Sequence, residues 1–246
     1  MKVLDLFSGI GGFSLGLERA GMETVAFCEI DTFCQKVLRK HWPGIPIFED
    51  VRSLDYDGAV DVICGGFPCQ DLSTSGKQSG IEGNRSGLWA EMFRIISSLQ
   101  PKYIIIENVA NLLNGEKGRW FAKLLNDLAS VGYDAEWHCI PAPYVGGLHH
   151  RERVWIIAYP NGQRWNSVAQ SIKGECTRIN LKDSRARWAS EDNIFLSMGR
   201  TFTKPRSGVQ RVDDGLSEAL DRLRGCGNSV VPQIPEIIGR AIMELV

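Results

Sequence analysis

The sequence predicts an α/β fold built on a mostly parallel, doubly wound sheet. Short apolar runs of strand length alternate along the chain with amphipathic runs of helical length. Glycine-rich turns or polar residues directly follow several of the apolar runs. A chain with this alternation forms a parallel sheet covered by helices on both faces, and such sheets bind ligands at the carboxyl ends of their strands.

Composition narrows the class of protein. The 246 residues can bury one sizeable core, and 43% hydrophobic and 23% charged residues are ordinary for a globular chain. No apolar run has the length of a membrane span, and Asp5 interrupts the first one, so we expect a cytoplasmic protein without a signal peptide. The seven cysteines include no C-x-x-C pair, which fits neither a disulfide framework nor a zinc site. We therefore expect no metal and a reducing compartment.

The first part of the chain has the pattern of a nucleotide-binding β-α-β unit. Its predicted elements are a strand at residues 3–7, a glycine-rich turn at 8–12, a helix at 13–20, a strand at 24–28, a helix capped by Asp31 and a short strand at 45–48. Glycines in such a turn let the backbone approach a ligand at the helix amino terminus. Glu29 follows Gly9 by 20 residues, a spacing at which a carboxylate can accept hydrogen bonds from a ribose. The unit predicts a cofactor that contains adenosine.

A cysteine-containing turn follows the next predicted strand, at residues 60–64. Gly65, Gly66 and Pro68 form a tight turn that places Cys69 just past the carboxyl end of this strand. The run 71–84 is polar and broken by glycines, so we expect a loop that can close over a ligand. The turn alone leaves two interpretations of Cys69 open: an inert free cysteine, which is the commoner case, or a nucleophile.

The later elements bring further charged residues to strand ends. They are a helix at 88–99, a strand at 103–106, a helix through 121–128 that stops at Gly132, a strand at 133–140 with one face towards a core, a loop at 141–147 and a strand at 154–158. Glu107 directly follows the strand at 103–106. Arg151 and Arg153 stand two residues apart on extended backbone, so their side chains point in the same direction. Standing alone, this pair favours salt bridging at the start of a strand.

A basic segment separates the last strand from the carboxyl-terminal elements. Residues 161–211 contain ten Lys/Arg and four Asp/Glu, a charge of +6 against -7 for the rest of the chain. This asymmetry is typical either of a solvated surface or of a polyanion-binding region. A final helix begins near Pro232, and its apolar face needs a sheet to cover it. We expect a catalytic and cofactor-binding domain of residues 1–158 plus 216–246, with residues 159–215 as a short target-recognition insertion.

Six stretches of the chain together resemble the ordered motifs of the cytosine-C5 DNA methyltransferases, in their compact, prokaryotic or phage form. They are residues 5–12, Glu29, residues 65–70, residues 107–109, residues 151–153 and residues 227–233. The resemblance implies a Rossmann-like fold that uses S-adenosyl-L-methionine, double-stranded DNA as the partner, a monomer without a metal, and a place in DNA methylation such as a restriction-modification system.

The same resemblance implies the residues of the site. Cys69, Glu107, Arg151 and Arg153 are the expected catalytic residues. The expected cofactor-binding residues are Phe7, Gly9 and Gly11 around the methionine part, Glu29 on the ribose, Asp50 near the adenine, Asn228 and Ser229 lining the site, and also Ile30, Val51, Phe67 and Pro68.

These residue types suit the reaction. Carbon 5 of cytosine becomes nucleophilic only after covalent attack at carbon 6, for which Cys69 would supply a thiolate. Glu107, as a protonated carboxyl, would donate to ring nitrogen 3, while Arg153 and Arg151 compensate charge around it. The base must first be flipped out of the duplex, and the loop at 71–84 is the candidate for closing over it.

Three other functions remain to be distinguished. A relative with the same motifs would methylate cytosine in RNA such as tRNA, and methyl incorporation into duplex DNA or tRNA separates the two substrates. A nicotinamide oxidoreductase would use the first β-α-β unit, but it gives no reason for the residues at 107–109 and 151–153. A catalytically silent binding protein gives no reason for a complete set of catalytic residues.

Overall fold

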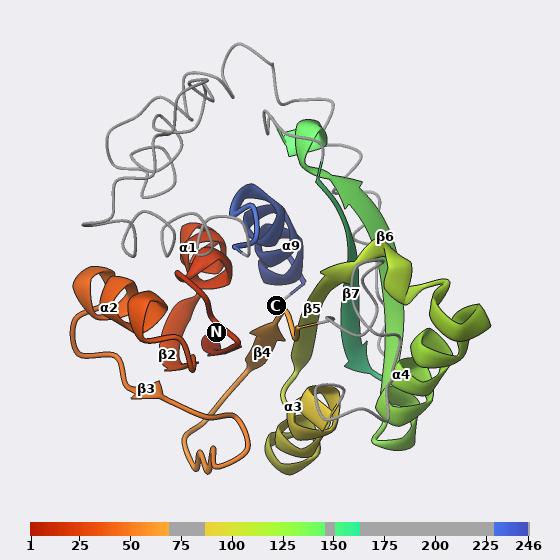
Figure 1. Ribbon diagram of the computed structural model, residues 1–246, viewed down its shortest axis with the longest axis horizontal. Helices are drawn as coiled ribbons and strands as arrows, with labels where there is room; N and C mark the ends of the chain where they lie inside the picture. Colours follow the sequence, from red (N-terminus) through yellow and green to blue (C-terminus); the bar gives the residue numbers. More distant parts are fainter. Residues whose placement is uncertain (69–86, 146–150, 163–228, 246) are drawn as a thin grey trace, which may run out of the picture.

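The computed structural model describes residues 1–68, 87–145, 151–162 and 229–245 (Figure 1). Cys69, the loop at 71–84, most of the basic segment and Asn228 lie outside the described residues.

The described elements follow the predicted alternation of strands and helices. They are β1 (Lys2–Leu6), α1 (Gly12–Arg19), β2 (Glu23–Cys28), α2 (Thr32–His41), β3 (Ile47–Phe48), β4 (Val62–Gly65), α3 (Gly87–Leu99), β5 (Tyr103–Val109), η1 (Ala110–Leu112), η2 (Gly115–Gly118), α4 (Arg119–Ser130), β6 (Tyr133–Pro141), η3 (Ala142–Val145), β7 (Glu152–Pro160) and α9 (Gln233–Met243).

The strands form one sheet in the order β3-β2-β1-β4-β5-β7-β6. The neighbours from β3 to β5 pair in parallel, whereas β7 runs antiparallel to both β5 and β6. The prediction of a mostly parallel sheet is therefore confirmed. The inserted β7 brings the chain back along β5, which carries Glu107, with Val109 opposite Arg153.

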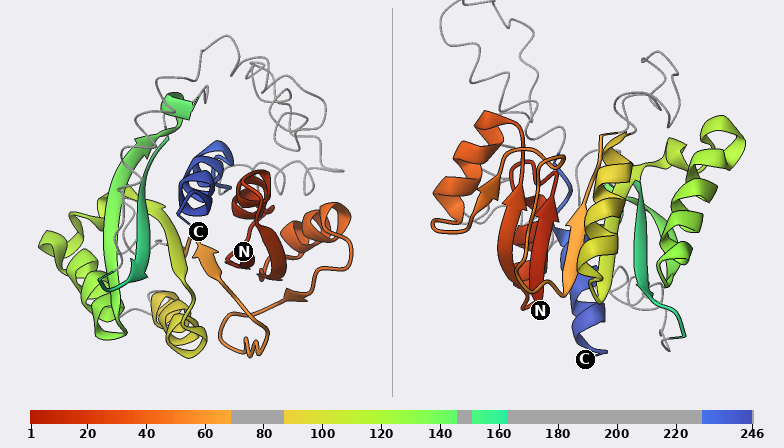
Figure 2. Two further views of the ribbon diagram at one scale, coloured as in Figure 1. Left: turned by 180° about the vertical axis from the view of Figure 1, so that it is seen from behind. Right: turned by 90° about the horizontal axis from the view of Figure 1, so that it is seen from below.

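Helices cover both faces of this sheet, as the doubly wound prediction requires. Figures 1 and 2 show α1 and α9 side by side on one face and α3 and α4 on the other. Successive residues of β5 point to opposite faces: Ile104 lies in the cluster under α3 and α4, and Ile105 lies in the cluster under α1 and α9. Each face thus has its own apolar core.

The final helix returns to the amino-terminal part of the sheet, as predicted from its apolar face. Gly16 of α1 allows this packing, because a Cβ atom there would collide with the backbone oxygen of Pro232. The buried face of α9 includes Ile234, Ile238 and Ile242. The division into a catalytic domain and an insertion stays a prediction.

Strand β6 lies at the edge of the sheet and packs against α4. Tyr133 and Ile140 are buried at its two ends, but they join the clusters on opposite faces of the sheet. Between them the strand is largely accessible, with Trp137 44% exposed and in edge contact with Phe121 of α4. The prediction of one face towards a core is confirmed on the α4 side, where Tyr133 belongs to the cluster under α3 and α4 and Ala135 packs against it. Because β6 is an edge strand, this face is covered only in part. A loop was predicted at 141–147, but Pro141 is the last residue of β6, and the short helix η3 follows directly.

In the described ranges, no helix is both long and apolar enough to cross a membrane. Across the same ranges, no three or more His, Cys, Asp or Glu side chains are grouped so that they could hold a metal ion.

Candidate active site

A small pocket lies at the carboxyl ends of the central strands. It is lined by Phe7, Ser8, Gly9, Phe13, Gly66, Glu107, Ser229 and Val230. These residues come from the turn after β1, the start of α1, the turn after β4, the end of β5 and the segment before α9. The pocket therefore joins predicted cofactor-binding residues to Glu107, which was predicted to be catalytic.

The glycine turn between β1 and α1 has an unusual backbone. Phe7, Gly9 and Gly11 all have positive φ, at 54°, 54° and 87°. Positive φ is energetically costly for a residue with a side chain, so the packing around Phe7 must hold its backbone in this conformation. A Cβ atom at Gly9 would meet nothing within 4 Å, so the space beside the turn is open to a ligand. This openness fits the methionine part of a cofactor.

A side chain at Gly11 would point into the protein interior, where Trp42 packs against the turn. A Cβ atom at Gly11 would lie 2.5 Å from Cζ3 of Trp42, and the indole Nε1 donates a 2.8 Å hydrogen bond to Oε1 of Glu18. Trp42 also makes an edge contact with Phe27 of β2. Sequence reasoning missed this support for the turn, since a tryptophan at the end of a helix carries no local signal for it.

Glu29 is buried to 9% exposure at the end of β2 and holds two backbone amides. Its Oε2 accepts a 2.6 Å hydrogen bond from the amide of Gly9, and its Oε1 accepts one of 2.7 Å from Asp31. Burial raises the pKa of Glu29, while these amides favour the charged form. Asp31 in turn caps α2, as predicted, by accepting from the amides of Phe33 and Cys34. The carboxylate therefore ties the glycine turn to the residue that caps α2.

The remaining predicted cofactor residues lie along the same edge of the sheet without lining the pocket. Ile30 is 68% exposed just past β2. Asp50 and Val51 begin the turn after β3, and β3 pairs in parallel with β2. Phe67 is buried against Trp89 of α3, whereas Pro68 is exposed. The edge is thus continuous from the glycine turn to Asp50.

Glu107 brings a charged side chain to the lining of the pocket. It is 7% exposed, and its Oε1 lies 3.1 Å from Nε of Arg153 and 3.4 Å from Nη2 of Arg151. Burial raises the pKa of Glu107, and the two arginines pull it back down. Burial also lowers the pKa of Arg151, although Glu107 opposes this shift. Both arginines therefore form ion pairs, as the sequence favoured, and their common partner is the carboxyl group that was predicted to be catalytic.

Two residues hold the turn before Cys69 against this carboxyl. A Cβ atom at Gly66 would lie 3.0 Å from Oε2 of Glu107, so a glycine is needed for this close approach. The side chain of Asn108 donates a 3.1 Å hydrogen bond to the backbone oxygen of Phe67. Asn108 stood in a recognised motif without an assigned role, and only the fold shows what it holds.

Comparison with known proteins shows the family of this chain. The family model described as C-5 cytosine-specific DNA methylase matches residues 1–204. The chain belongs to this family. The predicted resemblance is therefore confirmed, and S-adenosyl-L-methionine is the cofactor expected of a member of the family.

Relatives of this C-5 cytosine-specific methylase family member are type II methyltransferases. The chain is 39% identical over 162 residues to M2.BsuMI of Bacillus subtilis (strain 168), covering 64% of the chain and 42% of that relative. It is 40% identical over 219 residues to M.Eco47II of Escherichia coli, covering 84% of the chain and 51% of that relative. The matches thus span about half the length of these two proteins.

The fold also matches a solved structure of a putative DNA modification methyltransferase encoded within a prophage of E. coli. The TM-score is 0.68 at 19% identity, and the match covers 100% of this chain and 99% of the other. At that identity the likeness shows the fold alone, and it supports the predicted Rossmann-like architecture.

Proposed function

We propose that this protein is a DNA (cytosine-5-)-methyltransferase, which transfers a methyl group from S-adenosyl-L-methionine to carbon 5 of a flipped-out cytosine. The observation that carries the proposal is the buried Glu107, paired with two arginines in the pocket that also contains the cofactor turn. A carboxyl in this setting suits hydrogen bonding to a base, and family membership supplies the reaction class.

The residues along the sheet edge would hold the cofactor in an extended pose. Phe7, Gly9 and Gly11 would surround its methionine part, Glu29 its ribose, and Ile30, Asp50 and Val51 its adenine. Asn228, Ser229, Phe67 and Pro68 would complete the site. The open space beside Gly9 and the buried carboxylate of Glu29 just past β2 fit these roles. S-adenosyl-L-methionine supplies the electrophilic methyl group when bound.

Glu107 would act on the cytosine ring as a proton donor. Burial favours its protonated form, which can donate to ring nitrogen 3 when electrons move onto the ring. Arg151 and Arg153 oppose this shift, so the pKa of Glu107 is raised less than burial alone would raise it. The same arginines would stabilise negative charge near the cytosine carbonyl.

Cys69 would be the nucleophile. Its Sγ would form a bond to carbon 6, so that the ring electrons become available at carbon 5, and this bond would break after carbon 5 loses its proton. The hydrogen bond from Asn108 to Phe67 supports this role, because it fixes the backbone two residues before Cys69. The loop at 71–84 would close over the base and keep water away.

We propose double-stranded DNA as the partner, with recognition in the insertion 159–215, which contains the basic segment 161–211. Its excess of positive charge would bind phosphates and release counterions. The naming of the relatives as type II methyltransferases supports a place in a restriction-modification system. We further propose that the protein acts in the cytoplasm as a monomer.

The decisive experiment offers labelled S-adenosyl-L-methionine with duplex DNA or with tRNA. We expect label in cytosine of DNA, and label only in tRNA would show an RNA enzyme instead. DNA that carries 5-fluorocytosine should trap the wild-type protein covalently, because carbon 5 then has no proton to lose. The Cys69→Ser variant should form no adduct, and a surviving adduct would mean that another residue is the nucleophile.

A further inference from the structure

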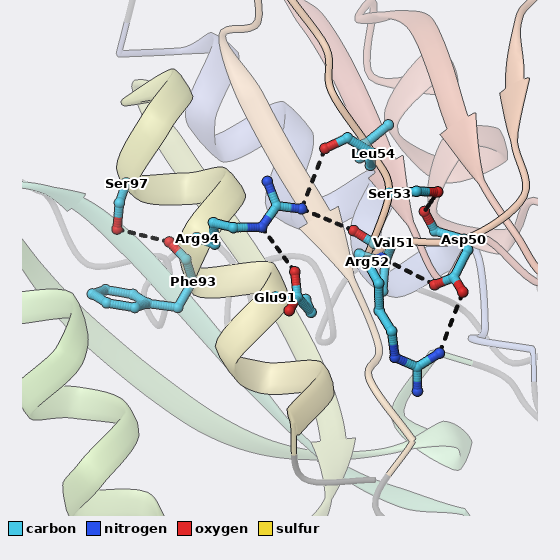
Figure 3. A network of polar contacts seen from close by, with 9 residues as sticks. All are labelled: Asp50, Val51, Arg52, Ser53, Leu54, Glu91, Phe93, Arg94 and Ser97. Carbon is cyan, nitrogen blue, oxygen red and sulfur yellow. Dashed lines mark hydrogen bonds and ion pairs between the residues drawn. The ribbon is translucent and has the colours of Figure 1, made fainter. Parts of the chain in front are cut away.

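The turn that carries Asp50 is a compact hydrogen-bonded unit (Figure 3). The backbone oxygen of Asp50 accepts hydrogen bonds from the amide and the hydroxyl of Ser53, both of 3.1 Å. The Oδ1 atom of Asp50 accepts a 2.9 Å hydrogen bond from the amide of Arg52, and Oδ2 lies 3.3 Å from the Arg52 guanidinium. These contacts fix the shape of the turn, but none of them fixes its place relative to the rest of the protein.

Arg94 of α3 connects this turn to the body of the fold. One guanidinium nitrogen, Nη2, donates to the backbone oxygens of Val51 and Leu54, at 3.0 Å and 3.2 Å (Figure 3). The Nε atom donates to Oε2 of Glu91 at 2.8 Å, one turn earlier on α3. Glu91 thereby orients the planar guanidinium, which leaves Nη2 directed at the two carbonyl groups.

Apolar packing brings the same residues to α3 from the other side. The side chains of Val51 and Leu54 are buried in the cluster that contains Met92 and Ile95 of α3. Their backbone oxygens are therefore held close to a helix, where a carbonyl without a donor is costly. The Val51 oxygen also accepts a 3.4 Å hydrogen bond from the Leu54 amide, so the loss of Arg94 should matter most at the Leu54 oxygen. A lysine could not replace Arg94 fully, because it lacks the planar fork that serves Glu91 and the carbonyls together.

We propose that Arg94 is a positioning residue for the adenine end of the cofactor site. It acts through the backbone oxygens of Val51 and Leu54 and sets the position of Asp50 along the sheet edge. Arg94 itself makes no contact with the cofactor in this proposal. The inference rests on the proposed function, because it takes Asp50 and Val51 as cofactor-binding residues.

The test measures binding of S-adenosyl-L-methionine by calorimetry to the wild type and to Arg94→Ala. The variant loses hydrogen bonds to two carbonyl groups, so we expect affinity to fall roughly tenfold. Arg94→Lys should lose less. In assays with DNA, KM for the cofactor should rise while KM for DNA and kcat stay near their wild-type values, because Cys69 and Glu107 are untouched.

Arg119→Ala is the matched control for loss of an arginine. Arg119 forms an i,i+3 ion pair with Glu116 at 3.0 Å, as Arg94 does with Glu91, but it belongs to α4. Its replacement should leave cofactor affinity unchanged. Glu91→Gln provides a milder variant should Arg94→Ala fold poorly, and it should weaken binding less than Arg94→Ala, because it only loosens the orientation of Arg94.

A double variant tests the route of the effect. If Arg94 acts through the turn, adding Arg94→Ala to Asp50→Ala should weaken binding by less than the product of the two single effects. Unchanged affinity in Arg94→Ala and Glu91→Gln, or fully multiplicative effects in the double variant, would overturn the inference and leave the proposed function standing. A wild-type protein that binds no S-adenosyl-L-methionine would instead overturn both.

Discussion

The Nε atom of Arg153 lies 3.1 Å from Oε1 of Glu107, across the antiparallel pair β5 and β7. This contact places the positive charge of Arg153 on β7 against the buried carboxyl of Glu107 on β5. Arg151, two residues earlier, reaches the same oxygen at 3.4 Å. The carboxyl therefore titrates under two opposing influences, burial and the arginines, and each can be changed separately.

Arg153→Ala should shift the pH dependence of the reaction. Burial raises the pKa of Glu107 and Arg153 lowers it, so removing the guanidinium should raise the pKa further. If protonated Glu107 is the active form, the alkaline fall in kcat should move to higher pH. Lost stabilisation of charge should also lower kcat itself, on the order of 100-fold. The measurement is kcat against pH, with Arg153→Lys as the charge-preserving control. An alkaline limb that stays in place would argue against Glu107 as the proton donor.

Gly11→Ala and Gly9→Ala should have different consequences in the same turn. At Gly11, a methyl group would collide with Trp42 at a positive φ, so we expect a loss of roughly 1 to 3 kcal/mol in the free energy of unfolding. At Gly9, the methyl group would enter open space, so the loss of stability should be smaller and cofactor binding should weaken. Denaturant unfolding and calorimetric binding give both quantities. Equal stability losses in the two variants would contradict the packing seen around Trp42.

Glu29→Gln should retain more cofactor affinity than Glu29→Ala. Glutamine keeps one acceptor oxygen for a backbone amide, whereas alanine releases both Gly9 and Asp31. We expect Glu29→Ala to weaken binding by roughly 1.5 to 3 kcal/mol, since it removes charge-assisted hydrogen bonds. Glu23→Ala, at the exposed start of the same strand, is the control and should bind normally. Full affinity in Glu29→Ala would remove this residue from the site.

Asp5→Asn should flatten the pH dependence of stability. Asp5 is fully buried on β1, and burial raises its pKa to about 7, even though Ser14 donates hydrogen bonds to it. A carboxyl with a raised native pKa stabilises the fold below its unfolded pKa of 3.8, and this stabilisation is lost as the pH rises to about 7. The wild type should therefore lose free energy of unfolding over that interval, by a few kcal/mol at most. Urea unfolding at several pH values measures the slope, and an equal slope in the variant would show that other groups cause it.

The sequence by itself determined the order of strands and helices and the residues at strand ends. The periods of apolar residues predicted β1 to β5, and Asp31 and the glycine turns marked where helices begin. These signals are local, because side-chain alternation, capping and turn chemistry depend on residues close together in the chain. The ordered motifs also sufficed to recognise the family, including Cys69, whose surroundings stay a prediction.

Tertiary structure alone decided what those residues touch. The insertion of β7 between β5 and β6 brings Arg151 to Glu107 across 44 positions of sequence. The contact of Trp42 with Gly11 and the hydrogen bonds of Arg94 to Val51 likewise join separate elements. The exposure of Trp137 on β6 has the same origin, since a strand's alternation does not reveal whether it lies at an edge. Such contacts depend on how whole elements pack against one another. The spacing of apolar residues predicts a helix or a strand, but it does not say where in the fold that element lies.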